Sequence, residues 1–385
     1  MDSNVFYDQA NAEGNDLEDN QTLKPESIGS VEGVYPDAKI KIERDQYSIF
    51  ELKRRYNKKN IILEPEFQRG DVWNIKQRSE LIESVLMGIP LPLIYLFERK
   101  DGKLAVVDGK QRLTTFFEFL NDKFTLTGLR ILTESNGKKF SELDVKFQSD
   151  LEDFQLIVQI IKPPTPDRIK FDIFDRVNRG GTSLNNQEMR NALYLGRSTR
   201  LLEKLSQKTE FMQATGYSVQ SNRMKDRYII LRFLAFYLWK NRLLYDKENN
   251  LIEYKSDLED FLGSTMEYLN WIDDVKEKDL EEKFTFSMKN AFSVLGEDVF
   301  RIPSNTDRRR PVSMTLFECL SYFFTLDNWI PYKQVIYSKL DDLFEDTIFY
   351  NSLTSNVDSR TMVDIRFGMM DKFAKGVKND FKNRN

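Results

Sequence analysis

One segment, Val107-Asp108-Gly109-Lys110-Gln111-Arg112-Leu113-Thr114, constrains the fold of this chain more than any other. It follows apolar residues typical of a strand and leads into a helical pattern with apolar side chains at positions 113, 116, 117 and 120. A glycine between a strand and a helix permits a sharp turn. The helix start presents N–H groups without intrahelical partners and the positive end of the helix dipole. The segment therefore predicts an anion-binding turn, to which Lys110 and Arg112 add positive charge.

Asp108 and Gln111 also fit a purely structural interpretation. Asp-x-x-Gln at a helix start is a capping box, which stabilises a helix by about 0.5–2 kcal/mol without any ligand. Lys110 and Arg112 lack such an explanation, because cations near a helix N-terminus oppose the dipole. Both interpretations of Asp108 and Gln111 stay open at this point.

The chain of 385 residues contains no histidine, which excludes whole classes of chemistry. Ser-His-Asp and Cys-His nucleophiles, His-ligated zinc and His-Asn-His nucleases all require imidazole. Cys319 is the only cysteine, so an intrachain disulfide is impossible, and a reducing cytoplasm is the expected location. The amino terminus lacks a secretory signal pattern, and Tyr228 to Trp239 is too short to cross a membrane and predicts a core helix.

Charge and periodicity predict three regions. Residues 1–38 carry nine acidic side chains against Lys24 alone, and such a leader is expected to be disordered. The formal charge of the whole chain is -4, so the remainder is net positive. Residues 39–165 have the strand and helix patterns of an α/β domain, and residues 166–385 are helical in periodicity throughout.

Local signals refine this division. The alternation of Ala38, Ile40 and Ile42 with charged residues predicts an edge strand with one buried face. Leu93–Phe97 and Leu104–Val107, separated by Asp101-Gly102, predict a hairpin. Helix starts are expected at four positions where a capping residue is followed by a Glu, a Gln or a proline: Ser48 with Glu51, Asn74 with Gln77, Thr165 with Pro166, and Asn185 with Glu188.

Further polar and basic residues are candidates for the same or another site. Gln68 and Arg69 precede a capped helix, so Arg69 is expected to reach the same anion. Asn178, Gly180 and Gly181 allow close approach of the backbone to a ligand, although paired glycines also simply end a helix. Two basic clusters would bind DNA phosphates if each lay on one face, and solvated loops are the competing explanation. They are Arg308, Arg309 and Arg310, and the closing Lys372, Lys375, Lys378, Lys382 and Arg384.

Together these segments resemble the amino-terminal domain of GmrSD-type modification-dependent restriction endonucleases. The resemblance rests on three ordered blocks, which are Phe67-Gln68-Arg69 through Trp73, Gly88-Ile89-Pro90-Leu91-Pro92 leading to Asp108–Thr114, and Asn178-Arg179-Gly180-Gly181 through Gln187-Glu188-Met189-Arg190-Asn191. It covers residues 40 to 200 and implies a ParB/sulfiredoxin-like fold. The expected fold class is therefore α+β, with this α/β domain followed by a helical domain.

The resemblance also implies an activity. The hallmark of the family is Asp-Gly-Gln-Gln-Arg, associated with nucleoside triphosphate binding and hydrolysis in antiphage defence, and here Lys110 replaces the first Gln. It implies a nucleotide site of Asp108, Gly109, Gln111 and Arg112, with Asp108, Gln111 and Arg112 as catalytic residues. Lys110 would join these as a phosphate ligand, and Mg²⁺ would lie at Asp108. Restriction-type members carry a downstream His-Asn-His nuclease domain, which these residues cannot form.

Two hypotheses follow, and a third is weaker. The first is a Mg²⁺-dependent nucleoside triphosphatase that regulates a restriction system and acts with DNA or a separate nuclease or effector protein. The second is a non-enzymatic DNA-binding or adaptor module that recruits an effector. The third is a nuclease that uses carboxylates alone, for which the sequence offers no Asp/Glu cluster with convincing metal spacing.

Overall fold

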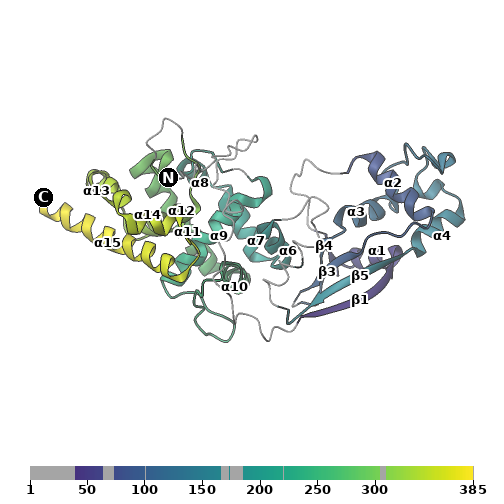
Figure 1. The fold of residues 1–385 in the computed structure, drawn as a ribbon, viewed down its shortest axis with the longest axis horizontal. Helices are drawn as coiled ribbons and strands as arrows, with labels where there is room; N and C mark the ends of the chain where they lie inside the picture. The colour runs from purple at the N-terminus through teal and green to yellow at the C-terminus, as the bar shows by residue number, and fades with distance from the viewer. Residues whose placement is uncertain are drawn as a thin grey trace, which may run out of the picture. The chain divides into compact units, whose positions relative to one another are not determined.

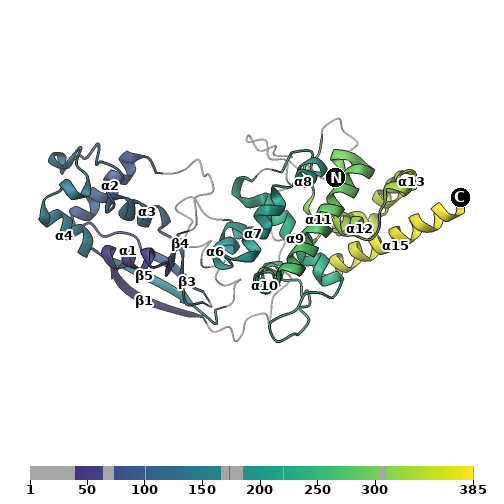
Figure 2. The same ribbon diagram turned by 180° about the vertical axis from the view of Figure 1, so that it is seen from behind.

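The chain folds into two compact units, which divide between Leu193 and Tyr194. The computed structural model describes residues 40–63, 73–99, 101–165, 173, 185–219, 221–303 and 309–384 (Figures 1 and 2). The acidic leader expected over residues 1–38 lies outside this part. The division falls later than the joint expected at Pro163–Pro166, because one more helix belongs to the first unit.

The N-terminal unit combines five strands with helices, and the helical unit that follows it completes the expected α+β class. Its strands are β1 (Lys41–Ser48), β2 (Ile61–Ile62), β3 (Ile94–Glu98), β4 (Leu104–Asp108) and β5 (Gln155–Lys162). Its helices are α1 (Ile49–Asn57), α2 (Ile75–Leu86), α3 (Lys110–Phe119), α4 (Val145–Asp153) and α6 (Asn186–Leu193).

The five strands form one mixed sheet in the order β1-β5-β3-β4-β2. Strands β3 and β4 form the expected antiparallel hairpin, with Tyr95 opposite Asp108 and a bulge between Tyr95 and Leu96. Strand β5 is parallel to β3 and antiparallel to β1, so the first and last strands of the unit lie side by side. The elbow after β4 therefore starts from the interior of the sheet.

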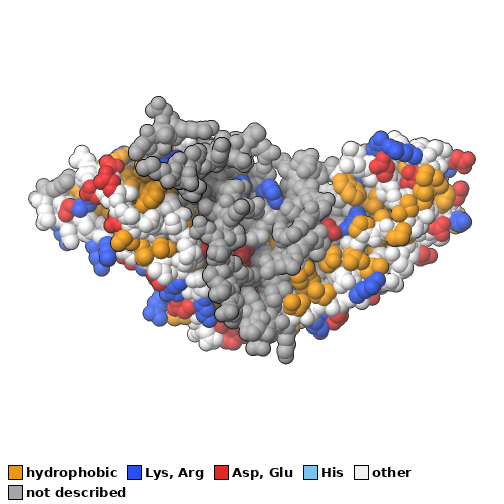
Figure 3. Space-filling view, viewed as in Figure 1, with side chains coloured by type: hydrophobic (Ala, Val, Ile, Leu, Met, Phe, Trp, Pro, Cys, Tyr) orange, Lys and Arg blue, Asp and Glu red, His pale blue; other side chains and the backbone are white. Residues whose placement is uncertain are grey.

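The two faces of the sheet have different coverings. On one face, Leu96, Val106 and Val158 join a large apolar core with the buried side chains of helices α1 to α4. The opposite face is smaller, and there Met189 of α6 packs in a cluster with Phe97, Val107 and Ile161. Outside this core, hydrophobic and charged side chains are interspersed over the helices of the unit (Figure 3).

Three of the expected helix caps are found in this unit. Ser48 caps α1 by accepting from the backbone N–H of Glu51. Asn74 and Gln77 form a complete capping box at α2. Asn185 and Glu188 form a reciprocal pair at α6, with distances of 2.7 and 2.8 Å. The cap expected at Thr165 is not tested, because Pro166 lies outside the described residues; the Thr165 hydroxyl instead accepts from the N–H of Lys41 at 3.0 Å.

The prediction for the first strand is wrong in its burial. Strand β1 begins at Lys41 and is an edge strand as expected. Ile40 and Ile42, however, are 55% and 43% exposed. The buried residue near its end is Tyr47, which pairs in register with Leu156 and joins the large core. The strict alternation in the sequence therefore marked a strand without indicating which residues it buries.

The second unit is helical, as its periodicity predicts. Its helices are α7 (Arg197–Ser206), α8 (Thr209–Ala214), α9 (Lys225–Lys240), α10 (Leu258–Trp271), α11 (Asp274–Leu295), α12 (Met314–Thr325), α13 (Lys333–Glu345), α14 (Thr347–Thr354) and α15 (Arg360–Arg384). Helix α9 contains the segment expected to be a core helix and is buried from Ile229 to Trp239. Among the residues that the structure describes, no helix combines the length and apolar character that crossing a membrane requires.

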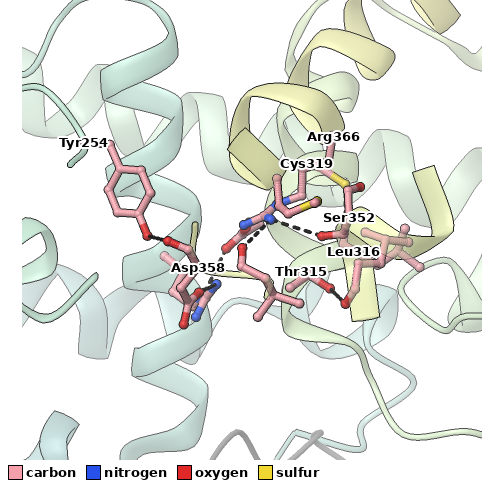
Figure 4. Close-up of polar contacts among 12 residues, drawn as sticks. Tyr254, Thr315, Leu316, Cys319, Ser352, Asp358 and Arg366 are labelled. Carbon is pink, nitrogen blue, oxygen red and sulfur yellow. Dashed lines mark hydrogen bonds and ion pairs between the residues drawn. The ribbon is translucent and has the colours of Figure 1, made fainter. Parts of the chain in front are cut away.

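A network of buried charges joins four segments of the helical unit (Figure 4). Glu318 of α12 accepts from Nε of Arg232 in α9 at 2.8 Å and from Nη2 of Arg366 in α15. The side chains of all three residues are fully buried. Arg232 also contacts Asp358, which precedes α15, at 3.1 Å. Burial alone lowers the pKa of Arg232, but Glu318 and the other partners reverse this and raise it well above its usual value.

Candidate functional site

The strongest sequence signal lies at the elbow between β4 and α3. Asp108 is the last residue of β4, and Gly109 is the N-cap of α3 with φ 94° and ψ 10°. This left-handed conformation suits glycine, because other residues pay a steric penalty there. Cδ1 of Ile94 lies 2.2 Å from the position of a Cβ on residue 109, so even a methyl group would collide with it. The elbow needs glycine for both its angle and its packing.

Helix α3 begins without a side-chain cap. Its first backbone hydrogen bond runs from the N–H of Leu113 to the carbonyl of Gly109 at 2.9 Å, so the amides of residues 110–112 precede that bond. Lys110 and Gln111 in this first turn are half-buried. The turn thus offers amide donors, a dipole and a cation in the arrangement that binds anions at helix starts.

The capping-box interpretation of Asp108 and Gln111 is wrong. Because the N-cap is Gly109, Asp108 lies one residue too early and belongs to the sheet, opposite Tyr95. Its carboxylate turns to Arg112 instead, with Oδ2 2.8 Å from Nη2. The start of α3 is therefore left without a side-chain acceptor.

Arg112 is the most constrained side chain of the site. It is 8% exposed, and its Nη2 donates to Asp108 and, at 3.0 Å, to the carbonyl of Leu93, while Nη1 donates to the carbonyl of Pro92. Burial lowers the pKa of Arg112, and the adjacent Asp108 carboxylate opposes that shift. These contacts join the Gly-Ile-Pro-Leu-Pro segment to the elbow, which the sequence motifs alone do not reveal.

The partners of Arg112 were missing from the sequence-based site. Pro92 and Leu93 take part through their carbonyl oxygens, and Ile94 through its contact with Gly109. Main-chain acceptors carry no signature of residue type. The one available signal was the position of Pro90 and Pro92 just before the hairpin, in the same block of the family resemblance as the elbow.

Other predicted ligands fall outside the described residues. These are Gln68, Arg69, Asn178, Gly180 and Gly181, together with Arg308 of the basic cluster. Their expected roles in nucleotide or DNA binding therefore remain predictions. Asp108, Gly109, Lys110, Gln111 and Arg112 are the predicted site residues that the structure places together.

The remaining arginines of the basic cluster are engaged within the helical unit. Arg309 forms ion pairs with Asp298 at 2.7 Å and Glu297 at 3.4 Å. The carbonyl of Arg310 accepts from Nη1 of Arg301, and the side chain of Arg310 is half-buried. A DNA phosphate at Arg309 would have to compete with two carboxylates.

Metal binding at Asp108 can be tested against the donor set. Within the described ranges, no group of three or more His, Cys, Asp or Glu side chains could hold a metal ion. Mg²⁺ is commonly bound through one or two carboxylates together with substrate phosphates and water. Asp108 fits that second arrangement alone, as a single carboxylate next to a phosphate site.

The comparisons with known proteins agree with this location. Residues 49–195 match the family described as GmrSD restriction endonuclease, N-terminal domain. The match spans the sheet, the elbow and α6, whose capping box and packing were described above. No curated protein matches the chain. The N-terminal part of this chain, over residues 49–195, therefore belongs to the GmrSD restriction endonuclease N-terminal domain family.

Proposed function

We propose that the N-terminal unit binds a nucleoside triphosphate at the start of α3 and regulates a GmrSD-type DNA restriction system. The observation that carries the proposal is the uncapped start of α3, where Gly109 turns the chain and Lys110 lies in the first turn. Triphosphates carry several negative charges, and such helix starts favour them. The family match over this unit supports the link to restriction, and entering DNA would be met in the cytoplasm.

Each group at the elbow has a role in this proposal. The amides of residues 110–112 and the ammonium group of Lys110 bind phosphate oxygens, and Gln111 donates a further hydrogen bond. Bound Mg²⁺ would neutralise phosphate charge, with Asp108 as its protein ligand. Asp108 and Gln111 would orient the attacking water during hydrolysis. Gln68, Arg69, Asn178, Gly180 and Gly181 remain proposed phosphate-side residues, on the resemblance alone.

DNA cleavage is not part of the proposed activity. The 385 residues contain no histidine and cannot form a His-Asn-His centre. Nucleotide state in this unit would instead control a separate nuclease or effector protein. The coupling would require that partner to bind the nucleotide-bound and nucleotide-free forms with different affinities.

Titration of the purified chain with ATP and with GTP, each with and without Mg²⁺, tests the binding step. Lys110→Ala should weaken binding about tenfold or more, because a charge-assisted hydrogen bond contributes roughly 1.5–3 kcal/mol. Lys146→Ala is the matched control, since Lys146 is an exposed lysine on α4 of the same unit. The hydrolysis step is tested by phosphate release. Absence of binding to both nucleotides would overturn the proposal.

A second function, DNA binding by an adaptor module, is favoured by the exposed face of α15. Lys372, Lys375 and Lys382 are exposed and, at positions i, i+3 and i+10 of one helix, lie along one side. Lys378, by contrast, is paired with Asp327. Such a row of lysines can bind phosphates without reading bases.

Mobility-shift titrations at two salt concentrations test this second function. Changing Lys372, Lys375 and Lys382 together to Gln should reduce the salt dependence by about 0.9 log units per lost phosphate contact. The control is a variant with the same charge change at three exposed lysines elsewhere in the helical unit: Lys247, Lys255 and Lys276. Equal DNA affinity of the two triple variants would rule out α15 as the DNA contact.

A further inference from the structure

We propose that Arg112 is a positioning residue, which holds Asp108 and the turn before β3 in place and does not contact phosphate itself. The inference rests on the proposed function, because it assigns a role within that site. It departs from the sequence expectation, in which the guanidinium group is a nucleotide ligand. It is argued from the contacts of Arg112, from the chemistry of its acceptors and from the anchoring of α3.

The donors of Arg112 are already committed to the protein. An arginine side chain has five N–H donors, of which Nη2 carries two. Both directions of Nη2 are occupied, by Leu93 at 3.0 Å and by Asp108 at 2.8 Å, and Nη1 donates to Pro92. The side chain is 8% exposed. A phosphate could gain Nη2 only by displacing an anion or a carbonyl that is already well placed.

The acceptors have a particular need for this guanidinium group. Pro90 and Pro92 lack N–H groups, so this segment cannot enter the sheet as a regular strand. The carbonyls of Pro92 and Leu93 precede β3 and receive their hydrogen bonds from Arg112. A planar guanidinium can satisfy several acceptors at fixed angles, which the single ammonium group of lysine cannot. The contact therefore fixes the path of the chain into β3.

The same group fixes the carboxylate of Asp108. Arg112 and Asp108 are four residues apart across the elbow, and the ion pair is shielded because only 10% of the arginine side chain is exposed. Charge pairs of this kind depend on both partners, since either alone leaves an uncompensated charge. Arg112 thereby sets the direction from which Asp108 faces the start of α3. The effects of changing the two residues should overlap.

The phosphate-binding elements, in contrast, have an anchor of their own. Helix α3 is held by Leu113, Phe116 and Phe117, all buried in the core of the unit. Loss of Arg112 should leave the amides and Lys110 near their positions and displace Asp108. Nucleotide affinity without Mg²⁺ and the rate of hydrolysis should consequently respond differently.

The test compares Arg112→Lys and Arg112→Ala with Asp108→Asn and the Arg112→Lys/Asp108→Asn double variant, using ATP and GTP as probes. We expect Mg²⁺-free dissociation constants within about threefold of the unaltered chain in both Arg112 variants. Turnover should fall at least about tenfold in both, because preserving the charge does not restore the fork. The double variant should lose little more than either single variant. Wild-type turnover in Arg112→Lys, or a Mg²⁺-free affinity loss of about tenfold in Arg112→Ala, would overturn the inference.

Arg78 supplies a matched control on the same helix. Its guanidinium pairs with Glu118 near the other end of α3, and its side chain is 13% exposed. Arg78→Lys should therefore perturb a comparable ion pair and leave turnover unchanged. A parallel loss of turnover in Arg78→Lys would mean that any damage to α3 lowers activity, and the inference would fail.

Hydrogen exchange separates this inference from the proposed function. In Arg112→Lys, the amides of residues 88–94 should exchange at least about tenfold faster than in the unaltered chain, and those of α2 should not change. This result requires no nucleotide. If neither ATP nor GTP binds, the proposed function fails, and exchange alone still decides whether Arg112 holds the turn. Unchanged exchange over residues 88–94 would refute the positioning role.

Discussion

The side chain of Ile94 packs against the backbone of Gly109, with its Cδ1 atom 2.2 Å from where a Cβ at residue 109 would lie. Ile94 is fully buried at the start of β3, so it has little freedom to withdraw. The hairpin thus determines the residue type at the elbow. Substitutions at the elbow will consequently affect stability as well as ligand binding.

Gly109→Ala should lower the free energy of unfolding by about 2–4 kcal/mol, from backbone strain at φ 94° together with the clash with Ile94. Urea unfolding of the N-terminal unit, followed by a local probe, measures this loss. Gly102→Ala is the control, because Gly102 has φ 76° but nothing within 4 Å of its Cβ position. That variant should lose only about 1 kcal/mol. Equal losses would show that Ile94 makes no contribution.

Glu83→Gln should destabilise the N-terminal unit by about 1–3 kcal/mol. The buried carboxylate accepts from the amides of Ile131 and Leu132 at 2.8 Å and of Arg130 at 3.4 Å, and so holds the segment that follows α3. An amide group has one oxygen acceptor in place of two. Glu80→Gln, on the same helix α2, should change stability little because Glu80 is only half-buried and has no comparable set of amide donors.

The effect of Glu83 should also depend on pH. Burial raises the pKa of Glu83, but the three amide donors outweigh it and hold the pKa below the ordinary value of 4.5. A lowered pKa in the folded state means that the stabilisation is complete above about pH 4.5 and is lost as the pH falls through the folded value. Urea midpoints of the unaltered chain and Glu83→Gln should therefore converge below pH 4. A constant difference between the two midpoints down to pH 3 would contradict this account.

Glu318→Gln should destabilise the helical unit by about 3–5 kcal/mol, because it leaves Arg232 and Arg366 buried without their shared counter-charge. Asp358→Asn should cost less, since the side chain of Asp358 is 41% exposed and water can replace it. Thermal and urea unfolding of both variants measure the difference. The account fails if the exposed carboxylate proves the more costly one to neutralise.

Cys319 should be unreactive in the folded protein. Burial raises the pKa of this thiol to about 12, so the nucleophilic thiolate is scarcely populated even at pH 10. Iodoacetamide should label Cys319 only in denaturant, where the thiol titrates near its usual value of 9.0. Rapid labelling of the native chain at pH 8 would show that the α12 environment opens far more readily than its packing implies.

Local signals in the sequence predicted many of the elements. The capping pairs Asn74/Gln77 and Asn185/Glu188 mark real helix starts, and the Asp101-Gly102 turn joins a real hairpin. Each of these signals involves residues within a few positions of one another. The hydrogen bonds that create the element are the ones that the sequence displays, which explains their success.

Long-range relationships could not be obtained in this way. The pairing of β1 with β5 joins Lys41 to Lys162, and no periodicity encodes that partner. The same limit applies at the site. The sequence identified Asp108 and Arg112 as important, but Arg112 takes its main-chain acceptors from a segment about 20 residues away. A local pattern suggested that Asp108 caps the helix, and the tertiary contact with Arg112 prevailed.

Helix α6 has a practical consequence for any fragment of this chain. Truncation at residue 165 would retain all five strands, yet it would remove Met189 from the cluster with Phe97, Val107 and Ile161. Those apolar side chains would then face water on a bare sheet, a condition that promotes aggregation. Expression of the domain alone should therefore extend through Leu193, so that the second side of the sheet keeps its cover.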